Sequence, residues 1–165
     1  MSDSKLITLQ EIDIGSRDWV AEMLEEWGMR LVVRKGTQLD AAALPGWVAQ
    51  IGGENAALLT YKIEDGALEV AVLKSWRENA GLGSALLEAA KQKARAAGCQ
   101  EVWLITTNDN LHALGFYQRR GFVLRALYPN ALAETRQIKP YVPKIGIDGI
   151  PLRDELELVY VIDAE

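Results

Sequence analysis

Three short apolar segments follow one another in the middle of the chain and are separated only by turn residues. They are WVAQI (47–51), AALLTYKI (56–63) and ALEVAVL (67–73). The gaps are Gly52-Gly53-Glu54-Asn55 and Glu64-Asp65-Gly66, and their Gly, Asn and Asp residues are typical of the tight turns between antiparallel strands. The pattern therefore predicts an antiparallel meander, which commits this part of the chain to a β-sheet.

Apolar periodicity and turn residues predict the elements around the meander. In chain order they are a strand at 5–12, a helix at 16–28, a strand or irregular edge at 30–36, a loop at 37–46, a helix at 82–97, a strand at 101–106, a helix at 109–121, and strands at 122–128 and 155–162. This order predicts a mixed α/β sheet in a single domain spanning residues 1–165.

Composition narrows the classes of function. The 165 residues, 49% of them hydrophobic, suffice for one domain with a proper core. A net charge of −5 argues against a nucleic-acid-binding surface. Cys99 and His112 are the only residues of their types, which argues against a zinc site, and we expect no metal. Without a signal-like start or a long apolar stretch, we expect no membrane partner and a cytoplasmic location.

Gly81 and Gly83 stand at the start of the predicted helix 82–97. Glycines let a backbone approach a ligand closely, and helix N-termini attract anions. A dinucleotide fingerprint needs a third glycine where this chain has Leu86, and no Walker A lysine follows. A simple turn is the alternative for an isolated pair of glycines.

Two motifs beside these glycines carry a resemblance to a known family. The first is Glu78-Asn79-Ala80-Gly81-Leu82-Gly83, and the second is NLHALGFYQRRGF (110–122). Together they resemble the GNAT superfamily of acyl-CoA-dependent N-acetyltransferases, whose motifs read Q/R-x-x-G-x-G/A and N-x-x-A-x-x-aromatic/Leu-Tyr-x-x-x-G-F. The motifs cover 68–124, and the order of elements agrees over nearly the whole chain. Glu78 departs from the family's Gln or Arg, which leaves one detail of diphosphate binding open.

The resemblance implies a GNAT-like α/β (α+β) fold, in which helices flank a mixed sheet that is splayed at its centre. It also implies acetyl-CoA as cosubstrate, with its diphosphate on the backbone around the two glycines and its pantetheine arm along the preceding strand. The residues expected to bind it are Val70, Val72, Leu73, Asn79, Ala80, Gly81, Leu82, Gly83, Ser84, Asn110, Ala113, Phe116 and Tyr117.

The resemblance also suggests catalytic roles. Tyr117 would donate a proton to the leaving thiolate; its alternative is simple packing in the core. Glu69, the only charged residue of its strand, would take the proton of the amine; its alternative is a solvated strand face. Glu155 and Glu157 on the last strand are weaker candidates for this base.

The implied function is transfer of an acetyl group from acetyl-CoA to a primary amine by direct attack in a ternary complex. The alternative is a non-catalytic acyl-CoA-binding or sensing module of the same fold. Residues 129–154 form a long loop expected on the acceptor side. The acceptor is a small-molecule amine or a peptide or protein amine, and a homodimer is left open.

Overall fold

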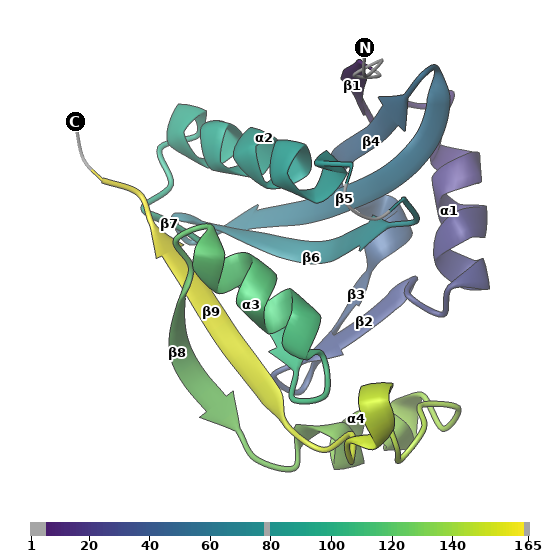
Figure 1. Ribbon diagram of the computed structural model, residues 1–165, viewed down its shortest axis with the longest axis vertical. Coiled ribbons are helices and arrows are strands. Elements are labelled where there is room, and N and C mark those ends of the chain that lie inside the picture. Colours follow the sequence, from purple (N-terminus) through teal and green to yellow (C-terminus); the bar gives the residue numbers. More distant parts are fainter. Residues whose placement is uncertain (1–5, 78–79, 164–165) are drawn as a thin grey trace.

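A seven-stranded sheet forms the centre of the computed structural model, which describes residues 6–77 and 80–163 (Figure 1). The elements are, in chain order, β1 (Ile7–Glu11), α1 (Arg17–Glu26), β2 (Leu31–Arg34), β3 (Thr37–Asp40), the 3-10 turn η1 (Ala41–Ala43), β4 (Gly46–Ile51), β5 (Glu54–Glu64), β6 (Ala67–Ser75), α2 (Leu82–Ala96), β7 (Glu101–Thr107), α3 (Leu111–Arg119), β8 (Val123–Tyr128), α4 (Ala131–Ile138), the 3-10 turn η2 (Ile147–Gly149) and β9 (Glu155–Val161). No described helix is both long and apolar enough to cross a membrane.

The strand order in the sheet is β1-β4-β5-β6-β7-β9-β8. β4, β5 and β6 are antiparallel neighbours, so the predicted meander is confirmed. β6 and β7 are the parallel pair of this sheet, and α2 connects them. The mixed sheet and its flanking helices confirm the predicted fold class.

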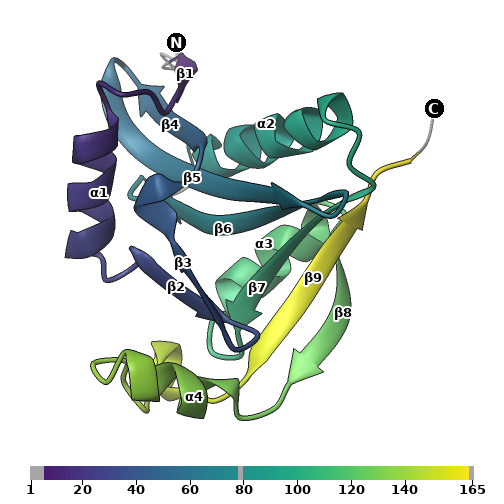
Figure 2. The same ribbon diagram turned by 180° about the vertical axis from the view of Figure 1, so that it is seen from behind.

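The sheet splits between β6 and β7. These strands pair only over Ala67–Glu69 and Glu101–Trp103. Beyond that point β6 continues to Ser75 beside β5, and β7 continues to Thr107 beside β9. Figures 1 and 2 show the two strands diverging. We call this divergence the split; it leaves one edge of β6 unpaired with β7 from Val70 onward.

A β-bulge lies at the start of this edge. Thr60 pairs with Val72 and Tyr61 pairs with Val70, so Ala71 is the extra residue on β6. A bulge interrupts the alternation of side chains and sharpens the local twist. The bulge therefore bends β6 at the point where it leaves β7.

The two faces of the sheet carry different layers (Figures 1 and 2). On the helix face, α2 and α3 cover a core that includes Leu86, Tyr117 and Phe122. On the opposite face, α1 packs Val20 and Leu24 against the sheet, beside the β2–β3 hairpin. We call this second side the hairpin face.

The structure corrects the expectation of a loop at 37–46. Thr37–Asp40 pair with Leu31–Arg34 as a hairpin, and η1 follows. Lys35 and Gly36 form its two-residue turn, both at positive φ (50° and 69°), which suits the twist of paired strands. The Asp40 side chain then accepts a hydrogen bond from the Ala42 N–H at 3.0 Å and caps η1.

The long segment 129–154 also differs from the expected loop, because it contains α4 and η2. The Arg136 guanidinium lies inside it and donates to the carbonyls of Val142, Pro143 and Leu152. The carbonyls of an irregular segment need hydrogen-bond donors, and this one guanidinium donates to three of them. The segment is therefore held together from within.

Candidate active site

The N-terminus of α2 opens beside the split. Gly81 precedes the helix at φ 79°, a left-handed conformation that glycine adopts without steric cost. Within residues 6–77 and 80–163, no side-chain hydrogen bond caps this end of the helix. The first N–H groups of a helix lack partners within it, so those of Leu82, Gly83 and Ser84 are available to an anion.

Gly83 allows α3 to approach α2 closely. A Cβ atom at this position would lie 3.0 Å from Cζ of Phe116. Phe116 in turn lies under the guanidinium of Arg120, 3.6 Å from the ring centroid. The same guanidinium donates from Nε to Oγ of Ser84 at 2.9 Å.

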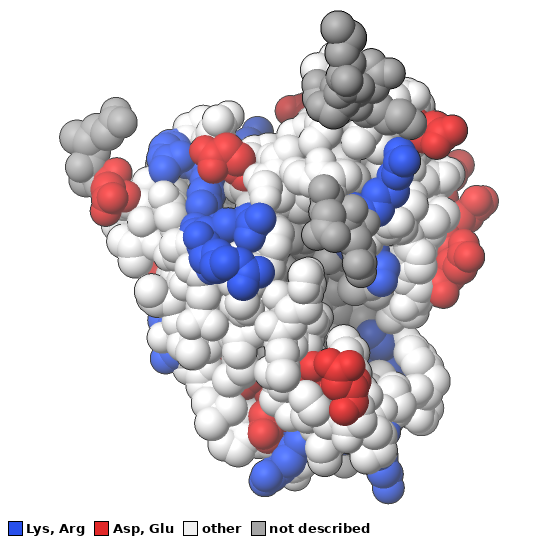
Figure 3. Space-filling model, in the orientation of Figure 1, with Lys and Arg blue, Asp and Glu red and all other residues white. Residues whose placement is uncertain are grey.

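Arg120 therefore places a positive charge at the helix end that we expect to hold a diphosphate. Figure 3 shows other basic side chains gathered over α2 and α3. Sequence reasoning did not select Arg120, because it occupies an unspecified position of the second motif. Only the packing of α3 on α2 brings it to Ser84.

The remaining residues expected to bind acetyl-CoA lie on both sides of the split. Val70 and Val72 are buried, and Leu73 packs against the core of the helix face. Asn110 accepts the Ala113 N–H at 3.1 Å and caps α3. Ala80 packs against the same core, whereas Glu78 and Asn79 lie outside the described residues.

Tyr117 lies inside the helix-face core. Its exposure is 9%, and its ring packs edge-on against Phe116 and Phe122 with centroids 5.4 and 5.7 Å away. Burial raises the pKa of Tyr117 to about 12. The phenol therefore packs in the core and also keeps its proton at neutral pH.

Glu69 lies on the hairpin face, at the last pair before the split. Its two carboxylate oxygens accept hydrogen bonds of 2.6 Å from Nε and Nη2 of Arg34. The exposure of Glu69 is 5%, so the alternative of a solvated strand face is wrong. The sequence offered no sign of this partner, which lies on the hairpin that was predicted in part as a loop.

Glu157 lies on the same face and is held by several groups. Lys35 and Arg125 form ion pairs with it, and the Tyr128 hydroxyl donates to it at 3.1 Å. Burial opposes its ionisation, but the hydrogen bonds from Lys35 and Arg125 outweigh burial and lower the pKa of Glu157. Lys35 also lies 4.4 Å from the ring centroid of Trp103. Glu157 is therefore a fixed negative charge.

Glu155 is two residues before Glu157 and differs from it in its surroundings. Its exposure is 4%, and its Oε2 atom is buried without a hydrogen-bond partner among the described residues. Burial raises the pKa of Glu155 to about 7, although the charge of Arg34 acts in the opposite direction. A carboxyl group in this state can hold or release a proton at neutral pH.

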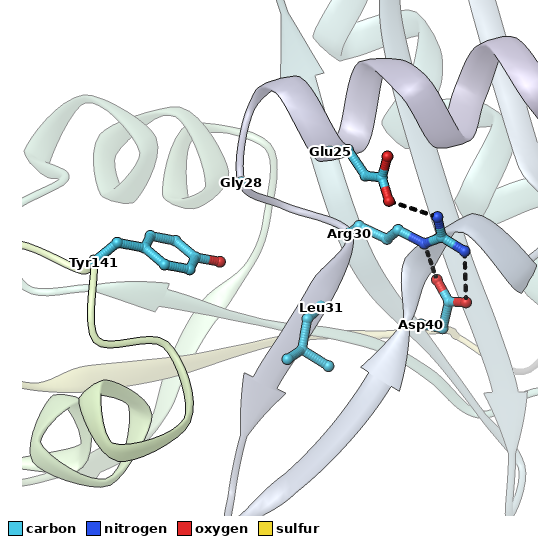
Figure 4. Close-up of a pocket in the computed structure, with 6 residues that line it drawn as sticks. All are labelled: Glu25, Gly28, Arg30, Leu31, Asp40 and Tyr141. Atoms are coloured by element: carbon cyan, nitrogen blue, oxygen red, sulfur yellow. Dashed lines mark hydrogen bonds and ion pairs between the residues drawn. The ribbon is translucent and has the colours of Figure 1, made fainter.

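A hollow of about 380 Å³ lies where the 129–154 segment meets the corner between α1 and β2 (Figure 4). The Tyr141 ring points toward this corner and lies 3.4 Å from the position of a Cβ on Gly28. Arg30, between Glu25 at 2.8 Å and Asp40 at 3.2 Å, forms the far wall. Lys139 Nζ also donates to the Leu31 carbonyl at 2.9 Å. The segment thus bridges to the α1–β2 corner.

No three His, Cys, Asp or Glu side chains gather as a metal site would require within residues 6–77 and 80–163.

Solved structures with the same arrangement are acetyltransferases. A GNAT family acetyltransferase from Elizabethkingia anophelis with acetyl-CoA bound superposes with a TM-score of 0.69 at 18% identity, over 94% of this chain and 98% of that one. The ribosomal-protein-S18-alanine N-acetyltransferase of Escherichia coli gives 0.68 at 16% identity, over 97% and 96% of the two chains. These similarities show that the chain has the fold of these acetyltransferases.

The sequence places the chain within one family of this fold. Residues 12–122 match the model of the acetyltransferase (GNAT) family, and the chain belongs to that family. Two uncharacterised proteins of Bacillus subtilis are similar to it. YdhI is 44% identical over 111 residues, which are 67% of this chain and 69% of YdhI. YxbD is 39% identical over 146 residues, which are 87% of this chain and 91% of YxbD.

Proposed function

We propose that the protein transfers the acetyl group of acetyl-CoA to a primary amine, by direct attack of the amine in a ternary complex. The observation that carries this proposal is the juxtaposition of the split with the N-terminus of α2, which Gly81 precedes. The split offers an extended backbone edge to a chain that bears amide groups, and the helix N-terminus offers N–H groups to an anion. Coenzyme A has an amide-bearing chain, its pantetheine arm, and an anion, its diphosphate.

In this proposal the diphosphate binds the backbone of Asn79–Ser84, including the two glycines, and Arg120 adds its charge. The pantetheine arm follows the β6 edge at Val70, Val72 and Leu73. Asn110, Ala113 and Phe116 line the arm from α3. The bound cosubstrate then presents its thioester near Tyr117.

The chemistry requires two proton transfers. The neutral amine attacks the carbonyl carbon of the thioester, the C–N bond forms, and the C–S bond breaks with its electron pair on sulfur. Tyr117 donates a proton to this thiolate, and the proton lost by the nitrogen returns to the phenol through water. The raised pKa of Tyr117 supports this role because the phenol is fully protonated before the reaction. Glu69, held by Arg34 at the base of the split, faces the side from which the amine approaches.

The acceptor approaches from the hairpin face, between the 129–154 segment and the α1–β2 corner. The hollow there is large enough for an amine side chain or a small molecule. The E. coli neighbour is named for acetylating the alanine of a ribosomal protein, which supports the amine class and does not distinguish a peptide from a small molecule.

Release of free thiol from acetyl-CoA tests the proposal. A polyamine, an amino-acid ester and an alanine-terminated peptide each represent one class of primary amine. We expect amine-dependent thiol release with at least one of them, together with a saturable heat of CoA binding. CoA binding without turnover on any amine would instead favour the acyl-CoA-binding or sensing module.

A further inference from the structure

Three carboxylates lie on the hairpin face beside the split, and they differ in what their oxygens contact. Glu69 has both oxygens on Arg34, and Glu157 is held by cations and a hydroxyl. The oxygens of both carboxylates are therefore already occupied by charge-assisted hydrogen bonds or ion pairs. Glu155 differs, because no group in the described part of the chain bonds its buried Oε2.

The groups that face Glu155 come from four elements. Arg34 on β2 and Glu134 on α4 are the charges that reach it. Its partners in the sheet are Thr107 on β7 and Tyr128 on β8. The Tyr128 hydroxyl is already bonded to Glu157, and Arg34 donates its Nε and Nη2 to Glu69. A buried polar atom without a partner is costly, and a native structure that keeps one needs a reason for it.

The position of Glu155 relates it to both the split and the hollow. Thr107, its partner, ends β7, and β7 is the strand that diverges from β6. Leu31 lines the hollow, and Arg34, whose charge acts on Glu155, ends the same strand. Three residue steps along a strand span about 10 Å. The hollow and the buried acid thus lie near the two ends of β2.

We propose that Glu155 is the general base that takes the proton of the acceptor's ammonium group. This inference rests on the proposed function. The ammonium nitrogen gives one proton to the Glu155 carboxylate, which becomes a neutral carboxylic acid. The nitrogen lone pair formed in this way attacks the thioester, and the acid later returns its proton to solvent. A pKa of about 7 matches a base that works at neutral pH.

The test is the pH dependence of kcat/KM for the best of the three amines named above. Glu155→Gln, Glu155→Asp and Glu69→Gln are compared with the wild type, and Glu88→Gln on the exposed side of α2 is the matched control. We expect the wild-type profile to rise with pH with a midpoint near 7. In Glu155→Gln, kcat/KM should lose this rise with pH and fall on the order of 10² to 10⁴-fold. Glu155→Asp should recover part of the rate and again show a rise with pH. Glu69→Gln and Glu88→Gln should keep the rise.

Each other outcome counts against the inference. If Glu155→Gln keeps the wild-type kcat/KM and its rise with pH, Glu155 has no part in the mechanism. If only Glu69→Gln loses the rise with pH, Glu69 is the base. If Glu155→Gln no longer binds CoA in calorimetry, the variant is misfolded, and a Glu155→Asp profile without the rise with pH then overturns the assignment. A wild type that binds CoA and acetylates none of the amines overturns the proposed function and this inference with it.

Discussion

Arg34 and Glu69 lie 35 residues apart in the chain, and the guanidinium holds both oxygens of the carboxylate at 2.6 Å. Both side chains are buried, so water replaces neither partner easily. The pair ties the β2–β3 hairpin to β6 at the last residue before the split. It makes the hairpin part of the site and fixes a negative charge there.

Arg34→Met should therefore destabilise the fold strongly. It leaves a buried carboxylate without its cation, which costs about 3 to 5 kcal/mol. Arg34→Met combined with Glu69→Leu should recover most of the loss, because no buried charge remains. Urea unfolding measures both variants. Arg30→Met, which breaks exposed ion pairs, is the control and should shift the midpoint far less. Equal losses in the single and double variants would show that the pair is not coupled.

Tyr117→Phe should lower kcat on the order of 10²-fold and leave the dissociation constant of CoA nearly unchanged. The substitution keeps the ring between Phe116 and Phe122 and removes only the proton donor. Tyr61→Phe is the control for loss of a buried tyrosine hydroxyl, because Tyr61 is similarly buried and its ring stacks on Trp47 rather than on Phe116 and Phe122. A near-native kcat for Tyr117→Phe, with chemistry rate-limiting, would make Tyr117 purely structural.

Gly81→Ala should weaken CoA binding, and Gly98→Ala should not. Both glycines have a similar left-handed φ, 79° and 75°, and neither Cβ would clash with a neighbour. Each substitution should therefore cost about 1 kcal/mol of stability through backbone strain. Only Gly81 precedes the helix end proposed to bind the diphosphate. Calorimetric titration with CoA separates the two effects, and equal affinities in the two variants would remove this helix end from the binding site.

Glu155 should make the protein less stable as pH rises. Its pKa is raised to about 7 in the folded state from the ordinary 4.5, so the folded state binds more protons between these values. The free energy of unfolding then falls as pH rises from 4.5 to 7, by at most about 3 kcal/mol and less where solvent reaches the group. Glu155→Gln should remove this decline.

Urea unfolding of both proteins at pH 5 and pH 8 measures the effect. The difference between the two pH values should shrink in Glu155→Gln and persist in Glu88→Gln. An identical pH dependence in Glu155→Gln and the wild type would mean that Glu155 titrates normally in the folded protein.

Arg136→Ala should raise the KM of the acceptor amine and leave CoA affinity unchanged. The guanidinium holds the carbonyls of Val142, Pro143 and Leu152, so its loss loosens the segment that borders the hollow. Arg153→Ala is the control, because Arg153 is exposed and its ion pair with Asp154 is long, at 3.6 Å. Initial rates at varied amine concentration measure KM. An unchanged KM, or a loss of CoA binding, would contradict the acceptor role of the segment.

Local sequence determined most of the elements. Turn residues between apolar runs predicted the meander of β4, β5 and β6, and helical periodicity predicted α1, α2 and α3. Gly81 could also be selected from the sequence, because glycine adopts the left-handed conformation found before this helix at no steric cost. These features depend on neighbours in the chain, and so the sequence carries them directly.

Tertiary structure alone decided the charge state of the site. Glu69, Glu155 and Glu157 are all glutamates in apolar strands. Their neighbours in the sequence do not distinguish one from another. The β2–β3 hairpin brings Arg34 to Glu69 and Lys35 to Glu157, whereas no described residue donates a hydrogen bond to the Oε2 atom of Glu155. Burial and the distance to opposite charge set the pKa of a carboxyl group, and both are created by contacts between residues far apart in the chain.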